Sequence, residues 1–165
     1  MINSSPASCD VKSYRKIADV LLLLIILPCL LSLINLSFAQ DWKIHFFSAA
    51  IILAAVVFGA GGGLLAGLTG SLYSALFLGN PYILVGNALF GLLSGVFYKK
   101  TGEIIPTVLL AYLCQLPWLI LSDYYFVHLP AIFIAKLVIV LFQTNALWAA
   151  LIHLGLNPIK KIFSC

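Results

Sequence analysis

The sequence predicts an all-α membrane protein: a compact bundle of six transmembrane helices whose N and C termini are both cytoplasmic. Of the 165 residues, 63% are hydrophobic and 8% are charged, and the mean hydropathy is +1.13. An average soluble domain is about 45–50% apolar and about 25% charged. So few charges cannot cover a surface in water, and the protein must therefore be solvated by lipid. The second observation is a series of apolar runs along the chain.

The first predicted helix follows a polar N-terminal segment, residues 1–17, and begins near Val20. A membrane-spanning helix needs about 20 largely apolar residues, with a range of roughly 17–25, and this run qualifies when it is extended to Phe38. A secretory signal peptide is the alternative, because Ser37-Phe38-Ala39 resembles a cleavage site. Cleavage there would leave five spans with their loops on the same sides.

Five further apolar runs follow, and turn signals separate them. A glycine cluster from Gly59 to Gly63 divides the second run from the third, and Gly79-Asn80-Pro81 precedes the fourth. The runs cover residues 44–58, 59–78, 81–98, 104–122 and 129–154. The six-helix domain therefore occupies residues 18–156, and residues 157–165 form a cytoplasmic tail.

The basic residues predict the orientation of the chain in the cell membrane. With six spans both termini share one side, and that side holds Lys12, Arg15, Lys16, Lys99, Lys100, Lys160 and Lys161. The opposite side holds only Lys43. Because basic residues accumulate on the cytoplasmic side, the termini are expected there. The outer face then carries residues 40–45, 79–82 and 123–128.

Small residues recur every four positions on the third span, which aligns them along one helix face. The two rows are Gly62, Ala66, Gly70 and Ser74, and beside them Gly63, Gly67 and Ser71. Small side chains let another helix approach closely in lipid. The rows therefore serve either packing within the bundle or docking against a partner membrane subunit.

Polar and aromatic residues near the outer face are the candidate ligand site. Lys136 lies about seven residues into the sixth span, roughly 10 Å deep at 1.5 Å per residue. A charge buried there marks a site by default, although a lysine can also snorkel to the headgroups. The other candidates are amides, aromatic residues and a carboxylate: Asn80, Tyr82, Asn87, Asp123, Tyr124 and Tyr125. The tyrosines could instead belong to an interfacial aromatic belt, and the amides could bond neighbouring helices.

The residue inventory argues against an enzyme. The sequence shows no paired carboxylates, no serine–histidine constellation and no phosphate-binding loop. Its 4 cysteines lack the spacing of metal ligands. We therefore expect no catalytic residues, metal or cofactor. The scattered basic residues form no stripe for nucleic acid.

Two stretches resemble a known family. The residues from Phe58 read Phe-Gly-Ala-Gly-Gly-Gly-Leu-Leu-Ala-Gly-Leu-Thr-Gly-Ser-Leu and continue through Gly79-Asn-Pro-Tyr to the Asn-x-x-x-Gly-x-x-x-Gly pattern at Asn87 and a basic loop. The chain ends with Leu-Asn-Pro-Ile-Lys-Lys-Ile-Phe. Together with the size and the six spans, these features resemble the substrate-binding S components of energy-coupling factor (ECF) transporters, which are ABC-type vitamin importers.

The resemblance implies a function and partners. An S component captures a vitamin or a related micronutrient in an outward pocket and docks on a transmembrane T subunit, which two cytoplasmic ATPases drive. The residues from Asn80 to Lys136 named above would then hold the ligand, and the small-residue rows would form the docking surface. The first helix lacks the Ala-x-x-x-Ala pair of many S components. Docking is therefore expected on the second and third helices, or on a dedicated T subunit.

Two other functions stay open from the residues alone. A small membrane scaffold or assembly subunit would use the small-residue rows in permanent complexes and would bind no ligand. An autonomous small-solute transporter would need inverted repeats and broken helices. The sequence does not define the ligand.

Overall fold

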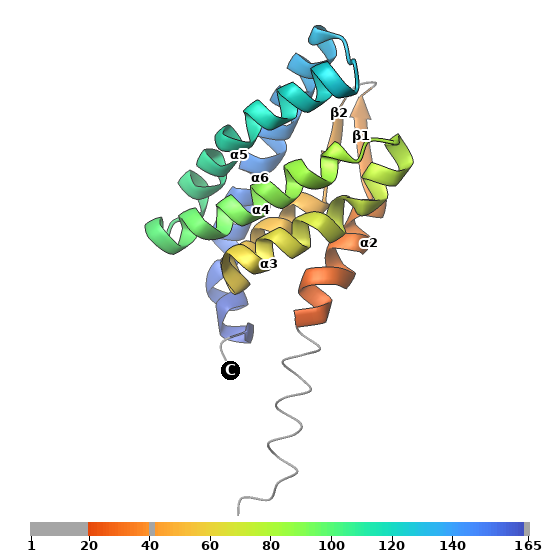
Figure 1. Cartoon of the computed structure of the whole chain (residues 1–165). Coiled ribbons are helices and arrows are strands. Elements are labelled where there is room, and N and C mark those ends of the chain that lie inside the picture. Colours follow the sequence, from red (N-terminus) through yellow and green to blue (C-terminus); the bar gives the residue numbers. More distant parts are fainter. Residues whose placement is uncertain (1–19, 40–41, 164–165) are drawn as a thin grey trace, which may run out of the picture.

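The structure, a computed structural model, describes residues 20–39 and 42–163 and is almost entirely helical (Figure 1). The predicted N-terminal segment, residues 1–17, lies outside the described residues. In chain order the elements are η1 (Leu22–Ile26), α2 (Leu27–Leu33), β1 (Asn35–Ala39), β2 (Trp42–His45), α3 (Phe47–Leu78), α4 (Tyr82–Thr101), α5 (Ile104–Leu121), η2 (Ser122–Phe126) and α6 (Ala131–Phe163). The two η segments are single turns of π-helix, η1 leading into α2 and η2 following α5.

Four helices among the described residues are long and apolar enough to cross a membrane. They are Phe47–Leu78, Tyr82–Thr101, Ile104–Phe126 and Ala131–Gly155. These helices indicate a membrane-embedded protein. A further apolar helix, Leu22–Leu33, is shorter than a span. The four long helices fall short of the six predicted spans for two reasons. Helix α3 contains both the second and the third predicted runs, which meet at Gly59, and the helix in the first run, Leu22–Leu33, is short.

A β-hairpin replaces helix at the end of the first predicted span and the start of the second. The helix ends at Leu33, and strand β1 pairs antiparallel with β2, Asn35 opposite His45 and Leu36 opposite Ile44. The sequence explains this difference, because polar and apolar residues alternate through both strands, the pattern of a strand rather than a helix. Averaged hydropathy hides such an alternation.

The predicted break at the glycine cluster is confirmed. Gly59 has φ 73° and ψ −159°, so α3 consists of two helices that meet there, residues 47–58 and residues 60–78. A positive φ of this size favours glycine, which has no Cβ to clash with the backbone. The predicted turn at Gly79 is also present, with φ 63° directly after α3.

Helices α3 and α4 lie side by side and touch through their backbones (Figure 1). Gly63 of α3 faces Gly91 of α4, and a Cβ on either glycine would overlap the carbonyl group of the other. Gly67 meets the backbone of Asn87 in the same way. Such close approach maximises van der Waals contact between helices, which stabilises their association in lipid.

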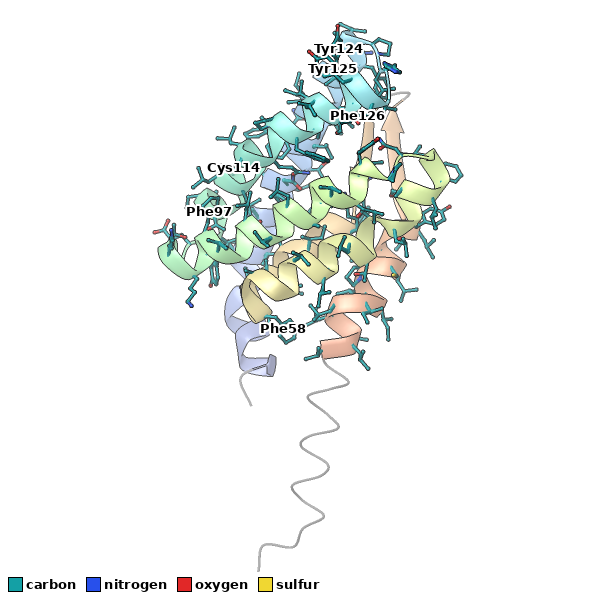
Figure 2. All side chains as sticks on the ribbon, viewed as in Figure 1. Phe58, Phe97, Cys114, Tyr124, Tyr125 and Phe126 are labelled. Carbon is teal, nitrogen blue, oxygen red and sulfur yellow. The ribbon has the colours of Figure 1, made fainter. Side chains whose placement is uncertain are left out.

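The first half of α3 forms the centre of the bundle. Ile51, Ile52 and Ala54 are fully buried, and they belong to one core cluster with buried residues of α4, α5 and α6. Figure 2 shows Tyr124, Tyr125 and Phe126 at one end of the molecule, which we call the η2 end, and Phe58 and Phe97 toward the other. Outside this core, large apolar side chains on the surface fit contact with lipid.

Helix α6 extends further than predicted. The sixth span was expected to end near Leu154, because a glycine, an asparagine and a proline follow, but the helix continues to Phe163. Most of the predicted tail, residues 157–165, is therefore helical rather than a separate segment. The end of α6 and the first described residues lie toward the same end of the molecule, away from η2 (Figure 1).

Candidate functional site

A buried polar pair joins two loops at the η2 end. Asn80 follows the last turn of α3, and its Nδ2 donates a hydrogen bond to Oδ1 of Asp123 in η2 over 3.3 Å. Asn80 is 7% exposed and Asp123 is 6% exposed. The carbonyl Oδ1 of Asn80 accepts a hydrogen bond from the backbone N–H of Tyr82 over 3.1 Å. Both ends of the Asn80 amide are therefore engaged, which fixes its orientation toward the carboxylate.

The irregular backbone of η2 places Asp123 at this position. The N–H of Val127 bonds to the carbonyl of Ser122, five residues back, and the N–H of Leu129 bonds to the carbonyl of Asp123. His128 has φ 58°, in the left-handed region that side chains rarely adopt. Single π-helical turns are frequent at functional sites, and strained residues cluster there too.

An aromatic pair also joins the two segments that the polar pair connects. The rings of Tyr82 and Phe126 stack with centroids 4.7 Å apart and an interplanar angle of 18°. The indole Nε1 of Trp118 on α5 donates a hydrogen bond to the carbonyl of Tyr82 over 3.3 Å. We call Asn80, Tyr82, Trp118, Asp123 and Phe126 the Asn80–Asp123 cluster. Sequence reasoning missed Trp118 and Phe126, although both are aromatic residues close to the predicted loop.

The other predicted ligand residues lie apart from this cluster. Tyr124 and Tyr125 are 48% and 64% exposed, and their rings contact each other edge-to-face, as members of an interfacial belt would. Asn87 is half-buried on α4, where its carbonyl group faces Gly67. Lys136 is exposed on α6, so the helices do not enclose it. The structure thus brings together Asn80, Tyr82 and Asp123 of the seven predicted residues.

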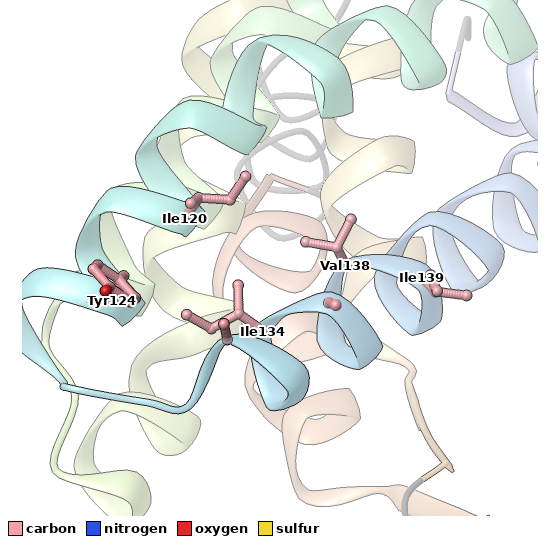
Figure 3. A pocket seen from close by; sticks show the side chains of 7 residues that line it. Ile120, Tyr124, Ile134, Val138 and Ile139 are labelled. Carbon is pink, nitrogen blue, oxygen red and sulfur yellow. The ribbon is translucent and has the colours of Figure 1, made fainter.

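An apolar groove of about 450 Å³ lies between α5, η2 and α6 (Figure 3). Its lining is Ile120, Tyr124, Ala131, Ile134, Ala135, Val138 and Ile139. Of the predicted ligand residues only Tyr124 lines it. Lys136 follows Ala135 directly and points about 100° away around the helix. The groove therefore offers apolar contact but no polar recognition.

The small-residue rows of α3 are buried within the chain. Gly63 and Gly67 face α4, Gly70 lies against Pro28 and Phe47, and Gly62 lies against its neighbour Phe58. The other members behave similarly: Ala66 and Ser71 are fully buried, and Ser74 is half-buried. Their positions favour the alternative of internal packing over direct docking of a partner on these residues.

Two further hydrogen bonds connect α6 to the bundle. The hydroxyl of Tyr112 donates to the carbonyl of Val138 over 2.6 Å, and Nε1 of Trp148 donates to the carbonyl of His45 over 3.2 Å. Within residues 20–39 and 42–163 no three His, Cys, Asp or Glu side chains gather as they would around a metal ion.

Comparisons with family models, with curated proteins and with solved structures find no match to this chain. The function must therefore be argued from the residues and their geometry.

Proposed function

We propose that this chain is a membrane-embedded binding subunit for a small organic solute, of the S-component kind. The observation that supports the proposal best is the buried Asp123 carboxylate paired with Asn80. Ionisable groups inside membrane proteins are costly and usually serve a function. The pair lies between two loops that the charge distribution assigns to the outer face, where a subunit of an importer would capture its solute.

The proposal includes the partners of such a subunit. The chain would occupy the cell membrane and dock on a transmembrane T subunit driven by two ATPases, because its own sequence has no nucleotide-binding motif. The glycine rows of α3 are covered by the chain itself. Docking would therefore use the side of α3 that remains exposed, where Leu65, Leu72, Leu76 and Phe77 are each at least 46% exposed.

In this arrangement the site is closed. Asn80 and Asp123 bond to each other, and Tyr82 stacks on Phe126, so a solute would enter when the η2 loop moves away from the loop after α3. The same mutual contacts support the alternative of a scaffold subunit, in which the cluster only fastens two loops.

Native mass spectrometry of the full chain, solubilised gently from membranes, separates the two proposals. We expect a co-purifying small molecule that is retained by Tyr125→Phe, an exposed position outside the cluster, and lost in Asp123→Asn. A chain that always carries a protein partner and never a small molecule would instead support the scaffold.

A further inference from the structure

We infer that the Asn80–Asp123 cluster selects a solute with a flat ring and a cationic or N–H-rich edge. This inference rests on the proposed function and names the class of ligand. Its basis is that the same two loops are joined twice, once by an amide on a carboxylate and once by a ring on a ring. A solute that separates the loops must replace both contacts.

The carboxylate determines the polar requirement. An ionised carboxylate offers about four acceptor positions. In the described part of the chain, the Asn80 amide donates a hydrogen bond to Asp123 over 3.3 Å. Because Asp123 is only 6% exposed, burial disfavours its ionised form, which therefore needs a partner of opposite charge or several donors to be stable. An amidinium, amine or aminopyrimidine edge supplies such donors, whereas an anionic solute would be repelled.

The aromatic pair determines the shape. Phe126 covers one face of the Tyr82 ring, yet Phe126 itself is 51% exposed, so its ring can leave without opening the core. A planar ring of the solute would take its place on Tyr82. Offset stacking suits such rings, and a positive charge on the ring adds a cation–π attraction.

The backbone carries both groups on one short segment. Asp123 and Phe126 belong to the same π-helical turn, and the strained His128 follows it. Asn80 and Tyr82 belong to the opposite loop, where Trp118 holds the carbonyl of Tyr82. A rearrangement of η2 would therefore separate Asp123 from Asn80 and Phe126 from Tyr82 in a single step.

The test compares two probes of nearly equal shape and opposite charge, benzamidine and benzoate. The purified full chain in detergent is titrated with each probe, and tryptophan fluorescence reports binding. We expect benzamidine to bind at least tenfold more tightly than benzoate, and Asp123→Asn to remove this preference. Tyr125→Phe is the matched control and should leave both affinities unchanged.

A second variant keeps the test decisive if Asp123→Asn does not fold. Phe126→Ala removes the competing ring, so benzamidine should bind several-fold more tightly than to the unmodified chain. Equal or tighter binding of benzoate, or weaker benzamidine binding in Phe126→Ala, would overturn the inference.

The two levels of the proposal fail differently. A co-purified solute that is anionic, and that Asp123→Asn still retains, contradicts the inference on ligand class but leaves the binding subunit in place. Absence of any co-purified solute, together with no response to either probe, contradicts the proposed function itself.

Discussion

The α3–α4 interface and the Asn80–Asp123 cluster hold neighbouring parts of the chain by opposite means. At the interface, Gly63 and Gly91 bring two backbones together with no side chain between them. At the cluster, a carboxylate, an amide and aromatic rings fill the space between two loops. No small molecule could replace the direct contact between the two backbones. A small solute could, in contrast, supply the same hydrogen bond and the same ring stacking that the side chains of the cluster make. The comparison therefore separates a rigid support from an exchangeable site.

Filling the α3–α4 interface should have the largest effect on thermal stability. Gly91→Leu places a side chain where even a Cβ overlaps the carbonyl of Gly63, so α3 and α4 must move apart. Overpacking typically costs about 1–3 kcal/mol and can cost more where the backbone obstructs relaxation. We expect a large fall in the thermal midpoint in detergent, or loss of folded protein.

The control for this variant is Gly61→Ala. Gly61 is exposed, and a Cβ there would meet nothing within 4 Å. The midpoint should stay within the error of the measurement. A Gly91→Leu chain as stable as Gly61→Ala would show that the two backbones do not meet as described.

Reversing the chemistry of the polar pair should have an intermediate effect. Asn80→Asp places a second carboxylate beside Asp123 and replaces the hydrogen bond by a repulsion. Leaving a buried polar group unsatisfied lowers the free energy of unfolding by about 1–3 kcal/mol. The exchange variant, Asn80→Asp with Asp123→Asn, restores one amide and one carboxylate. Thermal unfolding should show a clear loss in the single variant and partial recovery in the exchange. Equal losses in both would mean that the pair does not stabilise the loops.

Removing the aromatic contact should have a smaller effect. Phe126→Leu keeps an apolar side chain at a position that is 51% exposed, but it loses the stack on Tyr82. An aromatic pair contributes about 0.5–1.5 kcal/mol beyond its buried area. A midpoint decrease at the low end of this range is expected from thermal unfolding. A loss as large as that of Gly91→Leu would place Phe126 in the rigid part of the molecule.

Changing the exposed tyrosine should have the smallest effect. Tyr125 is 64% exposed and contacts Tyr124 rather than the cluster. Surface substitutions of this kind usually stay within about 0.5 kcal/mol. Tyr125→Leu should therefore unfold at nearly the same temperature as the unmodified chain, and a marked decrease would extend the cluster to this side of η2.

The sequence predicts the helical core well because its signals are local. Gly59 and Gly79 mark the ends of helical segments through their positive φ, and long apolar runs give the long helices. The hairpin was missed because each strand is only four or five residues long and lies beside strongly apolar helix, so averaged hydropathy conceals its alternation.

The candidate site was predicted only in part because proximity between loops is not a local property. Asn80 and Asp123 are 43 residues apart, and the residues next to each of them do not predict a hydrogen bond between the two. Lys136 drew attention as a charge in an apolar run, but depth along a helix does not define which way a side chain points. The glycine rows showed where helices meet closely, and α4 proved to be the nearest neighbour.

The hairpin changes how the chain reaches across a bilayer. The helix Leu22–Leu33 rises about 18 Å at 1.5 Å per residue. The five residues of β1 add about 17 Å at 3.3 Å per residue. Placed end to end they reach about 35 Å, more than the roughly 30 Å of hydrocarbon, with fewer residues than a helix of that length would need. The outer edges of a two-stranded sheet carry unpaired backbone N–H and C=O groups, which are costly in the hydrocarbon of a bilayer. The position of the protein in the bilayer is therefore limited by where these strand edges can contact water or a neighbouring protein.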